Sequence, residues 1–385
     1  MTATPLLPII LDLIRRSGPI TFERYMELCL YHPEHGYYMQ GRERTGIRGD
    51  YFTSPDLHPV FARLIARQAG EVWEMLGRPP RFTWVEMGPG RGFFAHDFLA
   101  GAGNQNPDFH KAIEYLAVEP GARQRAWLRE RFSGVDGGQR IRIVENLDEV
   151  ESVTGCFFSN ELVDAFPVHV VTRSGGKLNE VYVAAEGNRL VERIGKLSGT
   201  ELAAAVARYA HDLEEGHRAE LSLRSAEWVR AVAAKLARGF VITIDYGNLA
   251  ERLYTADRPR GTLMAYREHT AGEDFYNSPG ETDLTAHVNF SSLIDAGKEA
   301  GLEFAGFTTQ ERFLLALGEG NIFADICDPG QSEIEQLQAR LKLKRLINPE
   351  GMGNIFKVLI QRRRVEPSTL TGLKFQGQSQ VTGDE

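Results

Sequence analysis

The chain has 385 residues, and its 44 Lys and Arg against 52 Asp and Glu give a formal net charge of −8. Proteins whose main task is to bind nucleic acid usually carry a clustered basic surface, so this balance argues against that class. Hydrophobic residues make up 42% and charged residues 25% of the chain, which is the mixture of an ordinary globular protein. At roughly 150 residues per domain, the length allows about two or three domains, or one elaborated domain.

The cysteines and the apolar runs indicate in which cellular compartment the protein is expected. Cys29, Cys156 and Cys327 lie far apart and form no CxxC pair, so no disulfide framework is indicated. No metal is expected, because Cys29, His32 and His35 have no fourth ligand nearby. No apolar run approaches the roughly 20 residues that span a bilayer. We therefore expect a cytoplasmic protein without a membrane span.

Residues 1 to about 80 are predicted to be mostly helical. Between Pro59 and Gly77, apolar residues recur at the spacing of an amphipathic helix. A loop rich in Gly, Arg and Tyr, from Tyr37 to Pro55, precedes this helix. A structureless connection of this length is more often a lid or a binding loop than a simple tether. We expect a helical N-terminal cover, residues 1–80, that carries a lid loop.

From Phe82 onward, short apolar runs alternate with helical segments. Such runs are typical of parallel strands that are buried on both faces. The pattern predicts a doubly wound α/β domain over residues 81–364. The predicted strands are Phe82–Met87, Ile113–Val118, Ile141–Val144, Gly155–Ser159, Phe240–Ile244, Phe304–Thr308 and Phe356–Ile360.

Three further regions stand out along the chain. An insertion at about 168–238 is predicted to contain a hairpin from Val168 to Val183 and two alanine-rich helices on either side of Gly216. Residues 250–290 are interpreted as a second long loop. The polar, Gly- and Gln-rich tail, residues 365–385, is expected to be disordered.

A glycine-rich turn follows the first predicted strand. Gly88, Gly90 and Gly92 precede a helix that begins near Phe93, and bare backbone beside unpaired helix N–H groups can cradle a nucleotide or nucleoside. The order G-x-G-x-G differs from the dinucleotide fingerprint, so a plain tight turn remains an alternative. Glu86, at the end of the same strand, is either a solvent-capped strand end or a ligand contact.

The ends of the next two strands support a nucleoside site. Glu119 ends the second strand, where a carboxylate can accept hydrogen bonds from both ribose hydroxyls. Asn146 and Leu147 follow the third strand, where polar and backbone groups could read an adenine edge. A surface turn explains these two residues equally well.

A polar segment follows the fourth strand, at the sheet edge where open α/β sheets bind their ligands. Glu161 and Asp164, three residues apart, are interpreted as lying on one helical turn and pointing the same way. The alternative is that Asn160 caps this helix and the two carboxylates only favour its positive end.

The loop region 250–290 holds a dense set of polar residues. Loops on a rigid scaffold often carry function. No HxxxH or HExxH spacing supports a metal there. The set comprises Arg267, His269, Glu281, Asp283, His287 and Asn289.

These residues together resemble a known family. The core from Trp84 to Pro120 is similar to the class I S-adenosyl-L-methionine (SAM) dependent methyltransferases. Residues 15–362 resemble the MidA-like group of this class, through the motifs GDYFTSP, VEMGPGRG, SNELVDAFPV, IDYG and DLTAHVNF. That group includes a mitochondrial arginine methyltransferase of complex I assembly.

The resemblance implies a Rossmann-like, seven-stranded α/β sheet with an antiparallel last strand, a helical N-terminal cover and an α+β insertion. SAM is then expected at the carboxyl ends of the first two strands. The expected cofactor-binding residues are Glu86, Gly88, Gly90, Gly92, Glu119, Asn146, Leu147 and Asn160, with Thr53 and Ser54 from the FTSP motif.

The resemblance also implies methyl transfer to an arginine guanidinium of a protein substrate. Glu161 and Asp164 match the family's N-E-x-x-D motif, and paired carboxylates can bind a guanidinium bidentately. His287 is expected to orient the substrate or relay the proton. The alternatives are methylation of a small molecule or another side chain, and a SAM-binding assembly protein. A homodimer is left open. Without the resemblance, a nicotinamide-dependent dehydrogenase would be the competing interpretation.

Overall fold

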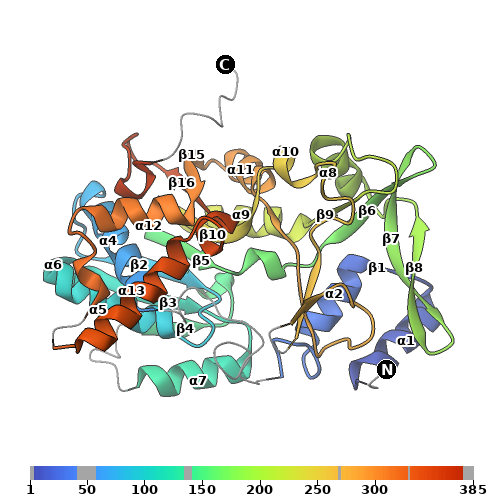
Figure 1. Ribbon diagram of the computed structural model, residues 1–385, viewed down its shortest axis with the longest axis horizontal. Helices are drawn as coiled ribbons and strands as arrows, with labels where there is room; N and C mark the ends of the chain where they lie inside the picture. Colours follow the sequence, from blue (N-terminus) through green and yellow to red (C-terminus); the bar gives the residue numbers. More distant parts are fainter. Residues whose placement is uncertain (1–3, 41–57, 134–140, 268–269, 328–329, 376–385) are drawn as a thin grey trace. The chain divides into compact units, whose positions relative to one another are not determined.

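The computed structural model describes residues 4–40, 58–133, 141–267, 270–327 and 330–375 (Figure 1). The chain divides into two compact units, each assembled from separate segments. Unit 1 comprises residues 1–52, 161–230 and 247–296, and unit 2 comprises residues 53–160, 231–246 and 297–385. The first 80 residues therefore contribute to both units.

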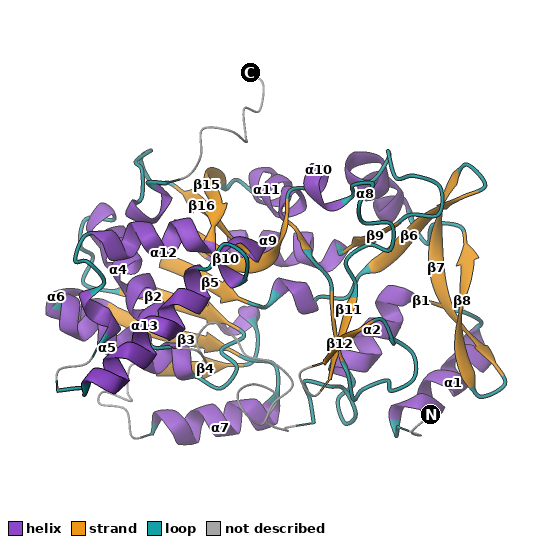
Figure 2. Ribbon diagram, viewed as in Figure 1, coloured by secondary structure: helices purple, strands orange, loops and turns teal. Residues whose placement is uncertain are grey.

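Seven strands of an eight-stranded mixed sheet form the centre of unit 2 (Figure 2). Its main path is β15-β16-β10-β5-β2-β3-β4, with β14 paired to the end of β10 off this path. The strands from β4 to β10 are parallel to their neighbours, whereas β16 is antiparallel to both β10 and β15. The expected α/β sheet with an antiparallel last strand is confirmed.

The elements of unit 2 before the insertion are α4 (Val60–Met75), β2 (Phe82–Met87), α5 (Phe93–Gln105), α6 (Pro107–Ala112), β3 (Ile113–Val118), α7 (Ala122–Phe132), β4 (Ile141–Val144), the 3₁₀ turn η1 (Leu147–Glu149) and β5 (Val153–Asn160). Those after it are β10 (Leu236–Asn248), β15 (Glu303–Thr309), α12 (Gln310–Glu319), η3 (Ala324–Ile326), α13 (Glu333–Ile347), α14 (Met352–Ile355), β16 (Phe356–Arg363) and η4 (Thr371–Leu373).

Apolar runs predicted the strands well. β2, β3 and β4 have the predicted bounds. β5 and β10 extend beyond them, because their ladder continues into less apolar residues from Leu236 to Arg238. In register, Met87 lies opposite both Val118 of β3 and Ser159 of β5, so these strands end at the same edge of the sheet.

Aromatic rings fill the core of unit 2. The ring of Trp84 on β2 stacks on Phe98 of α5 with centroids 4.4 Å apart, and Phe94 stacks on Phe158 of β5 at 4.5 Å. The apolar face of α4, including Phe61 and Leu64, joins the same core. The helix predicted between Pro59 and Gly77 is thereby confirmed.

The first part of the polar tail is ordered, which corrects our expectation for residues 365–375. Leu370 and Leu373 are fully buried in the core of unit 2. The N–H of Gly372 donates a hydrogen bond of 2.9 Å to Oε1 of Gln68 on α4. The polar composition was a poor guide here, because the burial of two leucines is enough to order a short turn.

Unit 1 contains an antiparallel sheet with the path β1-β7-β6-β9, and β8 also pairs with β7. The predicted hairpin is confirmed: Ser174 pairs with Lys177 across Gly175 and Gly176, which both have positive φ. The alanine-rich helices predicted around Gly216 are α8 and α9. β1, from the N-terminal region predicted as helical, joins this sheet through Ile20 and Val183.

The elements that lie wholly or mainly in unit 1 are α1 (Leu6–Ser17), β1 (Ile20–Thr21), α2 (Phe22–Tyr31), η2 (Val163–Ala165), β6 (His169–Ser174), β7 (Lys177–Glu186), β8 (Arg189–Gly195), α8 (Thr200–Tyr209), β9 (Arg218–Leu221), α9 (Leu223–Lys235), α10 (Ala250–Leu253), β11 (Met264–Arg267), β12 (Thr270–Gly272), β13 (Asp283–Thr285), β14 (Val288–Asn289) and α11 (Phe290–Glu299). The last residues of α9 and α11 belong to unit 2.

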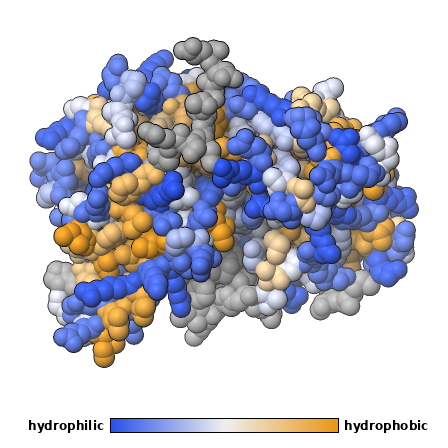
Figure 3. All heavy atoms as spheres, turned by 45° about the horizontal axis from the view of Figure 1, so that its top comes forward, coloured by the Kyte–Doolittle hydropathy of each residue, from blue (hydrophilic) through white to orange (hydrophobic). Residues whose placement is uncertain are grey.

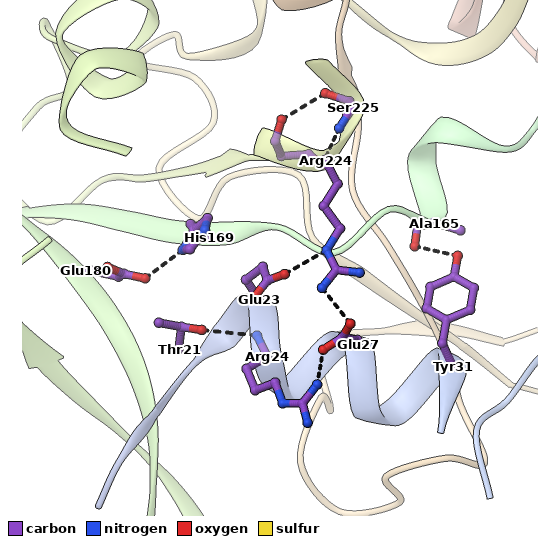
Figure 4. Close-up of polar contacts among 11 residues, drawn as sticks. Thr21, Glu23, Arg24, Glu27, Tyr31, Ala165, His169, Glu180, Arg224 and Ser225 are labelled. Atoms are coloured by element: carbon purple, nitrogen blue, oxygen red, sulfur yellow. Dashed lines mark hydrogen bonds and ion pairs between the residues drawn. The ribbon is translucent and has the colours of Figure 1, made fainter. Parts of the chain in front are cut away.

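Charged pairs anchor α2 within unit 1 (Figure 4). Arg224 donates hydrogen bonds to Glu23 at 2.9 Å and to Glu27 at 2.5 Å, and Arg24 also pairs with Glu27. The Thr21 side chain caps the helix by accepting from the N–H of Arg24 at 3.1 Å. These contacts hold α2 beside α9, on the same unit as η2.

Residues 250–290, interpreted above as a loop, contain regular structure. Their strands form a three-stranded sheet with the order β12-β11-β13. Each strand has only three or four residues, too few to leave a recognisable alternation in the sequence. In the part of the chain that the structure describes, no helix has both the length and the apolar character to cross a membrane.

Candidate active site

The turn between β2 and α5 has an unusual backbone. Gly88, Gly90 and Gly92 have φ of 68°, 52° and 73°, in the left-handed region that residues with a side chain rarely adopt. Gly92 is the N-cap of α5, and among the described residues no side chain caps this helix. The first N–H groups of α5 are therefore available to a polar ligand.

Two of the three glycines meet different surroundings. A Cβ on Gly92 would lie 2.9 Å from Cδ2 of Leu128 and 2.9 Å from Cζ of Phe132, whereas a Cβ on Gly90 would have no atom of the described residues within 4 Å. Packing and backbone together require glycine at 92. Only the backbone requires it at 90, where the open side leaves room for a ligand.

Glu86 is buried, so it is not the solvent-capped strand end that was the alternative. The hydroxyl of Tyr115 on β3 donates a hydrogen bond of 2.5 Å to Oε2 of Glu86. Burial raises the pKa of Glu86 to about 7, although this hydrogen bond opposes the shift. The carboxyl is thus fixed in orientation at the end of β2.

Glu119 lies just beyond the end of β3, next to the glycine turn. The N–H of Gly88 bonds the carbonyl of Val118 at 3.0 Å, and the N–H of Glu119 bonds that of Val144 at 3.0 Å. Oε1 of Glu119 accepts a hydrogen bond of 2.7 Å from the N–H of Gly121. Burial raises the pKa of Glu119 to about 7, against the opposing effects of Gly121 and Arg125.

These groups suit an adenosine-bearing ligand. A carboxylate offers about four lone-pair positions, so Glu119 can accept ribose hydroxyls while keeping its bond to Gly121. The glycine turn and the uncapped start of α5 supply bare backbone and N–H donors beside it. The donor set therefore fits SAM.

The remaining predicted cofactor residues are placed as follows. Oδ1 of Asn146 accepts from the N–H of Asp148 at 2.9 Å and so caps η1, whose first residue is Leu147. Asn160 is the last residue of β5 and pairs in register with Ile244. Thr53 and Ser54, with the predicted lid loop from residue 41 on, lie outside the described residues.

Glu161 occupies a strained corner, which corrects the prediction of a helical turn. Its φ is +51°, in the left-handed region, where a residue with a side chain costs roughly 1–2 kcal/mol. η2 comprises only Val163–Ala165 and has no side-chain cap, so Asn160 does not cap a helix either. The left-handed residue separates β5 from η2, and Glu161 and Asp164 do not share a helix face.

The structure does bring Asp164 near the segment that carries His287. The Asp164 side chain is buried, and its main-chain oxygen accepts from the N–H of Ala286 at 3.0 Å. From the other side, the hydroxyl of Tyr31 on α2 donates to the carbonyl of Ala165 at 3.0 Å (Figure 4). η2 is therefore held from two sides.

A second buried carboxylate, Asp283, was not among the predicted catalytic residues. It is 2% exposed on β13, and Oδ1 accepts from the hydroxyl of Tyr38 at 2.7 Å. Burial raises the pKa of Tyr266, and the charges of Asp164 and Asp283 raise it further, which places Tyr266 near both. Asp283 belonged to the polar set noted in the sequence and Tyr38 to the predicted lid loop, whereas Tyr266 was not singled out.

The main chain of His287 is fixed by a short network. Oγ1 of Thr262 accepts from the N–H of His287 at 3.1 Å and donates to Oε2 of Glu220 at 2.9 Å. The N–H of Thr262 also donates to this oxygen, at 2.8 Å. Glu220, on β9 of the insertion, is 3% exposed. The insertion thereby helps to position His287.

Known proteins match most of this chain. Residues 64–308 match the Methyltransf_28 family model, which describes S-adenosyl-L-methionine-dependent methyltransferases. The Xenopus laevis protein arginine methyltransferase NDUFAF7, mitochondrial, is 24% identical, over 92% of this chain and 84% of that protein. Its human counterpart is 26% identical, over 94% and 84%. The expected cytoplasmic location is contradicted, because these relatives are named as mitochondrial proteins.

A solved structure agrees with the fold and the cofactor. A Burkholderia thailandensis protein with S-adenosyl-homocysteine bound superposes with a TM-score of 0.85 at 32% identity, covering 96% of this chain and 94% of that one. A native crystal structure of a COG1565 superfamily protein from the same organism gives a TM-score of 0.84 at 31% identity. These matches confirm the resemblance drawn from the motifs.

Proposed function

This chain belongs to the S-adenosyl-L-methionine-dependent methyltransferase family, and on that premise we propose that it transfers a methyl group to an arginine side chain of a protein. The observation that carries the proposal is the buried carboxylate of Asp164, which follows the end of β5 shortly after Glu161. The names of the frog and human relatives as protein arginine methyltransferases support the choice of substrate.

The cofactor would be held by unit 2. Gly88, Gly90 and Gly92 would offer backbone, Glu119 would accept the ribose hydroxyls, and Glu86 would stay fixed by Tyr115. When bound, SAM supplies a methyl group on a sulfonium, which a well-aligned nucleophile can displace. The chain's task is therefore mainly to align the acceptor.

Arginine is a poor nucleophile because its guanidinium stays protonated, with a pKa above about 12. Carboxylates can bind the guanidinium fork bidentately, fix one nitrogen, and stabilise the positive charge. We assign this binding to Glu161 and Asp164. Glu161 directly follows Asn160, and its left-handed backbone sets the direction in which its side chain leaves the main chain.

The acceptor nitrogen must lose one proton as the methyl group is gained. A carboxylate hydrogen-bonded to that N–H is the direct acceptor, and Glu161 is our candidate. We assign His287 the weaker role of orienting the substrate or passing the proton on, since its main chain lies next to the segment bonded to Asp164.

The test uses the full chain with radiolabelled SAM and a proteome extract, followed by mass spectrometry of the labelled residue. Methylated arginine is the expected product. Glu161→Gln and Asp164→Asn should each lower turnover by roughly a hundredfold, since losing one partner of a charged pair costs 2–5 kcal/mol. Binding of S-adenosyl-homocysteine should be unchanged in calorimetry.

Glu201→Gln is the matched control, because Glu201 is an exposed carboxylate on α8 of the same unit. It should methylate at the normal rate. Labelling of a residue other than arginine would refute the substrate class, and normal turnover in Glu161→Gln would refute the carboxylate's role.

A further inference from the structure

Helix α13 carries apolar side chains on two opposite faces. Ala339, Leu343 and Leu346 are buried in unit 2. Ile334, Leu337 and Leu341 are instead 70%, 57% and 55% exposed. The exposed three recur at i, i+3 and i+7 and therefore form one stripe along the outer face of the helix. We call these three residues the α13 stripe.

A neighbouring segment adds a fourth exposed apolar side chain. Ile322 is 90% exposed and has a φ of +54°, which is an outlier for a β-branched residue. η3, which follows it closely, packs against α13. In the space-filling view, apolar side chains gather on the left of the molecule (Figure 3). Large exposed apolar patches mark interaction sites, and strained backbone concentrates at functional positions.

The charges along α13 change sign from one end to the other. Glu333 and Glu335 lie in the first turn, and Lys344 and Arg345 lie in the last. Glu335 is engaged in a capping box with Ser332. Among the described residues, neither Glu333 nor Lys344 has an ion pair within the chain.

The charges along one α13 helix are complementary to those along a second α13 helix that runs in the opposite direction. If two copies of α13 pack antiparallel across a two-fold axis, the Glu333 end of each helix meets the Lys344 end of the other, whereas parallel packing would oppose like charges. The stripe would then be buried in the middle. A lipid surface would favour basic flanks alone, and the last ten residues of the chain offer a single aliphatic anchor, Val381.

We propose that the α13 stripe is a dimerisation surface, on which a second copy of this chain packs its own α13 antiparallel. α13 has 15 residues and is about 22 Å long, so the helix pair is smaller than a standard interface. The expected dimer is therefore reversible, with a dissociation constant in the micromolar range. The proposal is independent of the substrate of the enzyme.

The test is sedimentation velocity on the full chain between about 1 and about 100 μM, the range in which such a dimer would dissociate. The native chain should shift from monomer to dimer. The double variant Leu337→Asp and Leu341→Asp should stay monomeric throughout. Because both side chains are exposed in the monomer, its thermal unfolding should be unchanged. Ile194→Asp, at a 58% exposed position on β8, is the matched control and should dimerise normally.

Charge reversal tests the antiparallel arrangement. Glu333→Lys and Lys344→Glu should each weaken the dimer a few-fold, as expected for ion pairs at an interface rim, and the double variant should restore it. A native chain that stays monomeric overturns the proposal. So does a dimer that survives the Leu337 and Leu341 substitutions. If the double charge variant does not recover the dimer affinity of the native chain, the antiparallel packing is wrong.

Discussion

The carboxylate of Glu119 accepts a hydrogen bond of 2.7 Å from the main-chain N–H of Gly121, two residues further on. This bond orients the carboxylate at the end of β3 without occupying all of its acceptor positions. Burial nevertheless raises its pKa to about 7. The residue that we expect to bind the ribose therefore holds its proton at a higher pH than an exposed glutamate does.

The first prediction concerns the pH dependence of ligand binding. Ribose hydroxyls donate to the ionised carboxylate, so binding should lower the pKa of Glu119 and release a proton below about pH 7. The affinity for S-adenosyl-homocysteine should rise up to about tenfold per pH unit toward pH 7 and then level off. Calorimetry in buffers of different ionisation enthalpy measures both effects.

Glu86 titrates in the same range, because burial raises its pKa to about 7 as well. Glu119→Gln should bind more weakly and lose most of the pH dependence, whereas Glu86→Gln should retain the part that Glu119 contributes. An unchanged pH profile in Glu119→Gln would contradict the assignment of this carboxylate to the ribose.

The second prediction separates the two glycines of the β2–α5 turn. Gly92→Ala should destabilise the protein by roughly 2–4 kcal/mol, because left-handed backbone strain adds to overpacking against Leu128 and Phe132. Gly90→Ala should cost only the strain, about 1–2 kcal/mol, since its Cβ meets no atom of the described residues within 4 Å. Chemical denaturation measures this difference.

The effect of Gly90→Ala on ligand binding should differ from its effect on stability. If its open side faces the ligand, Gly90→Ala should weaken S-adenosyl-homocysteine binding by more than its small effect on stability suggests. Equal unfolding free energies for the two variants would show that the surroundings of Gly92 relax around a methyl group.

The third prediction concerns Thr262, which links Glu220 to His287. Thr262→Val keeps the shape of the side chain but removes the hydroxyl that donates to Glu220 and accepts from the N–H of His287. A partly buried N–H left without its acceptor should cost about 1–3 kcal/mol in unfolding experiments. Turnover should fall more than the affinity for S-adenosyl-homocysteine.

Thr262→Ser restores the hydroxyl and should recover both stability and turnover. A loss of stability in Thr262→Val without a change in kcat would show that the position of His287 does not matter for methyl transfer.

The fourth prediction tests the ordered part of the tail. Leu370 is fully buried, so Leu370→Ala should destabilise unit 2 by about 2–5 kcal/mol in thermal or chemical unfolding. Leu341→Ala, at a 55% exposed position on α13, is the matched control and should change stability by less than about 0.5 kcal/mol in dilute solution. Equal effects would mean that the tail turn contributes nothing to folding.

Much of the sheet was predictable because strands buried on both faces must be continuously apolar. Ile113–Val118 and Ile141–Val144 have the predicted bounds for that reason, and the hairpin at Gly175 and Gly176 followed from two glycines that tolerate positive φ. The glycine turn at 88–92 was predictable on the same ground. Local sequence determines these features because their energies come from adjacent residues.

The candidate catalytic residues were only partly predictable. Glu161 and Asp164 were proposed from their position after a strand, but they do not share a helical turn, because Glu161 adopts left-handed backbone and η2 begins only at Val163. Asp283 belonged to the polar set noted in the sequence and Tyr38 to the predicted lid loop, but the contact between these two residues, 245 positions apart, could not be predicted. Spacing along the chain carries no information about such a pair.

The sequence by itself therefore determined the class of sheet, the glycine turn after β2 and the carboxylate after β3, since apolar period and glycine placement are local properties. Only the tertiary structure decided which carboxylates are buried, how Thr262 connects Glu220 to His287, and that the polar tail folds onto α4. Burial and hydrogen bonding between distant segments exist only after the chain has packed, and burial then raises the pKa of carboxyls such as Glu86 and Glu119.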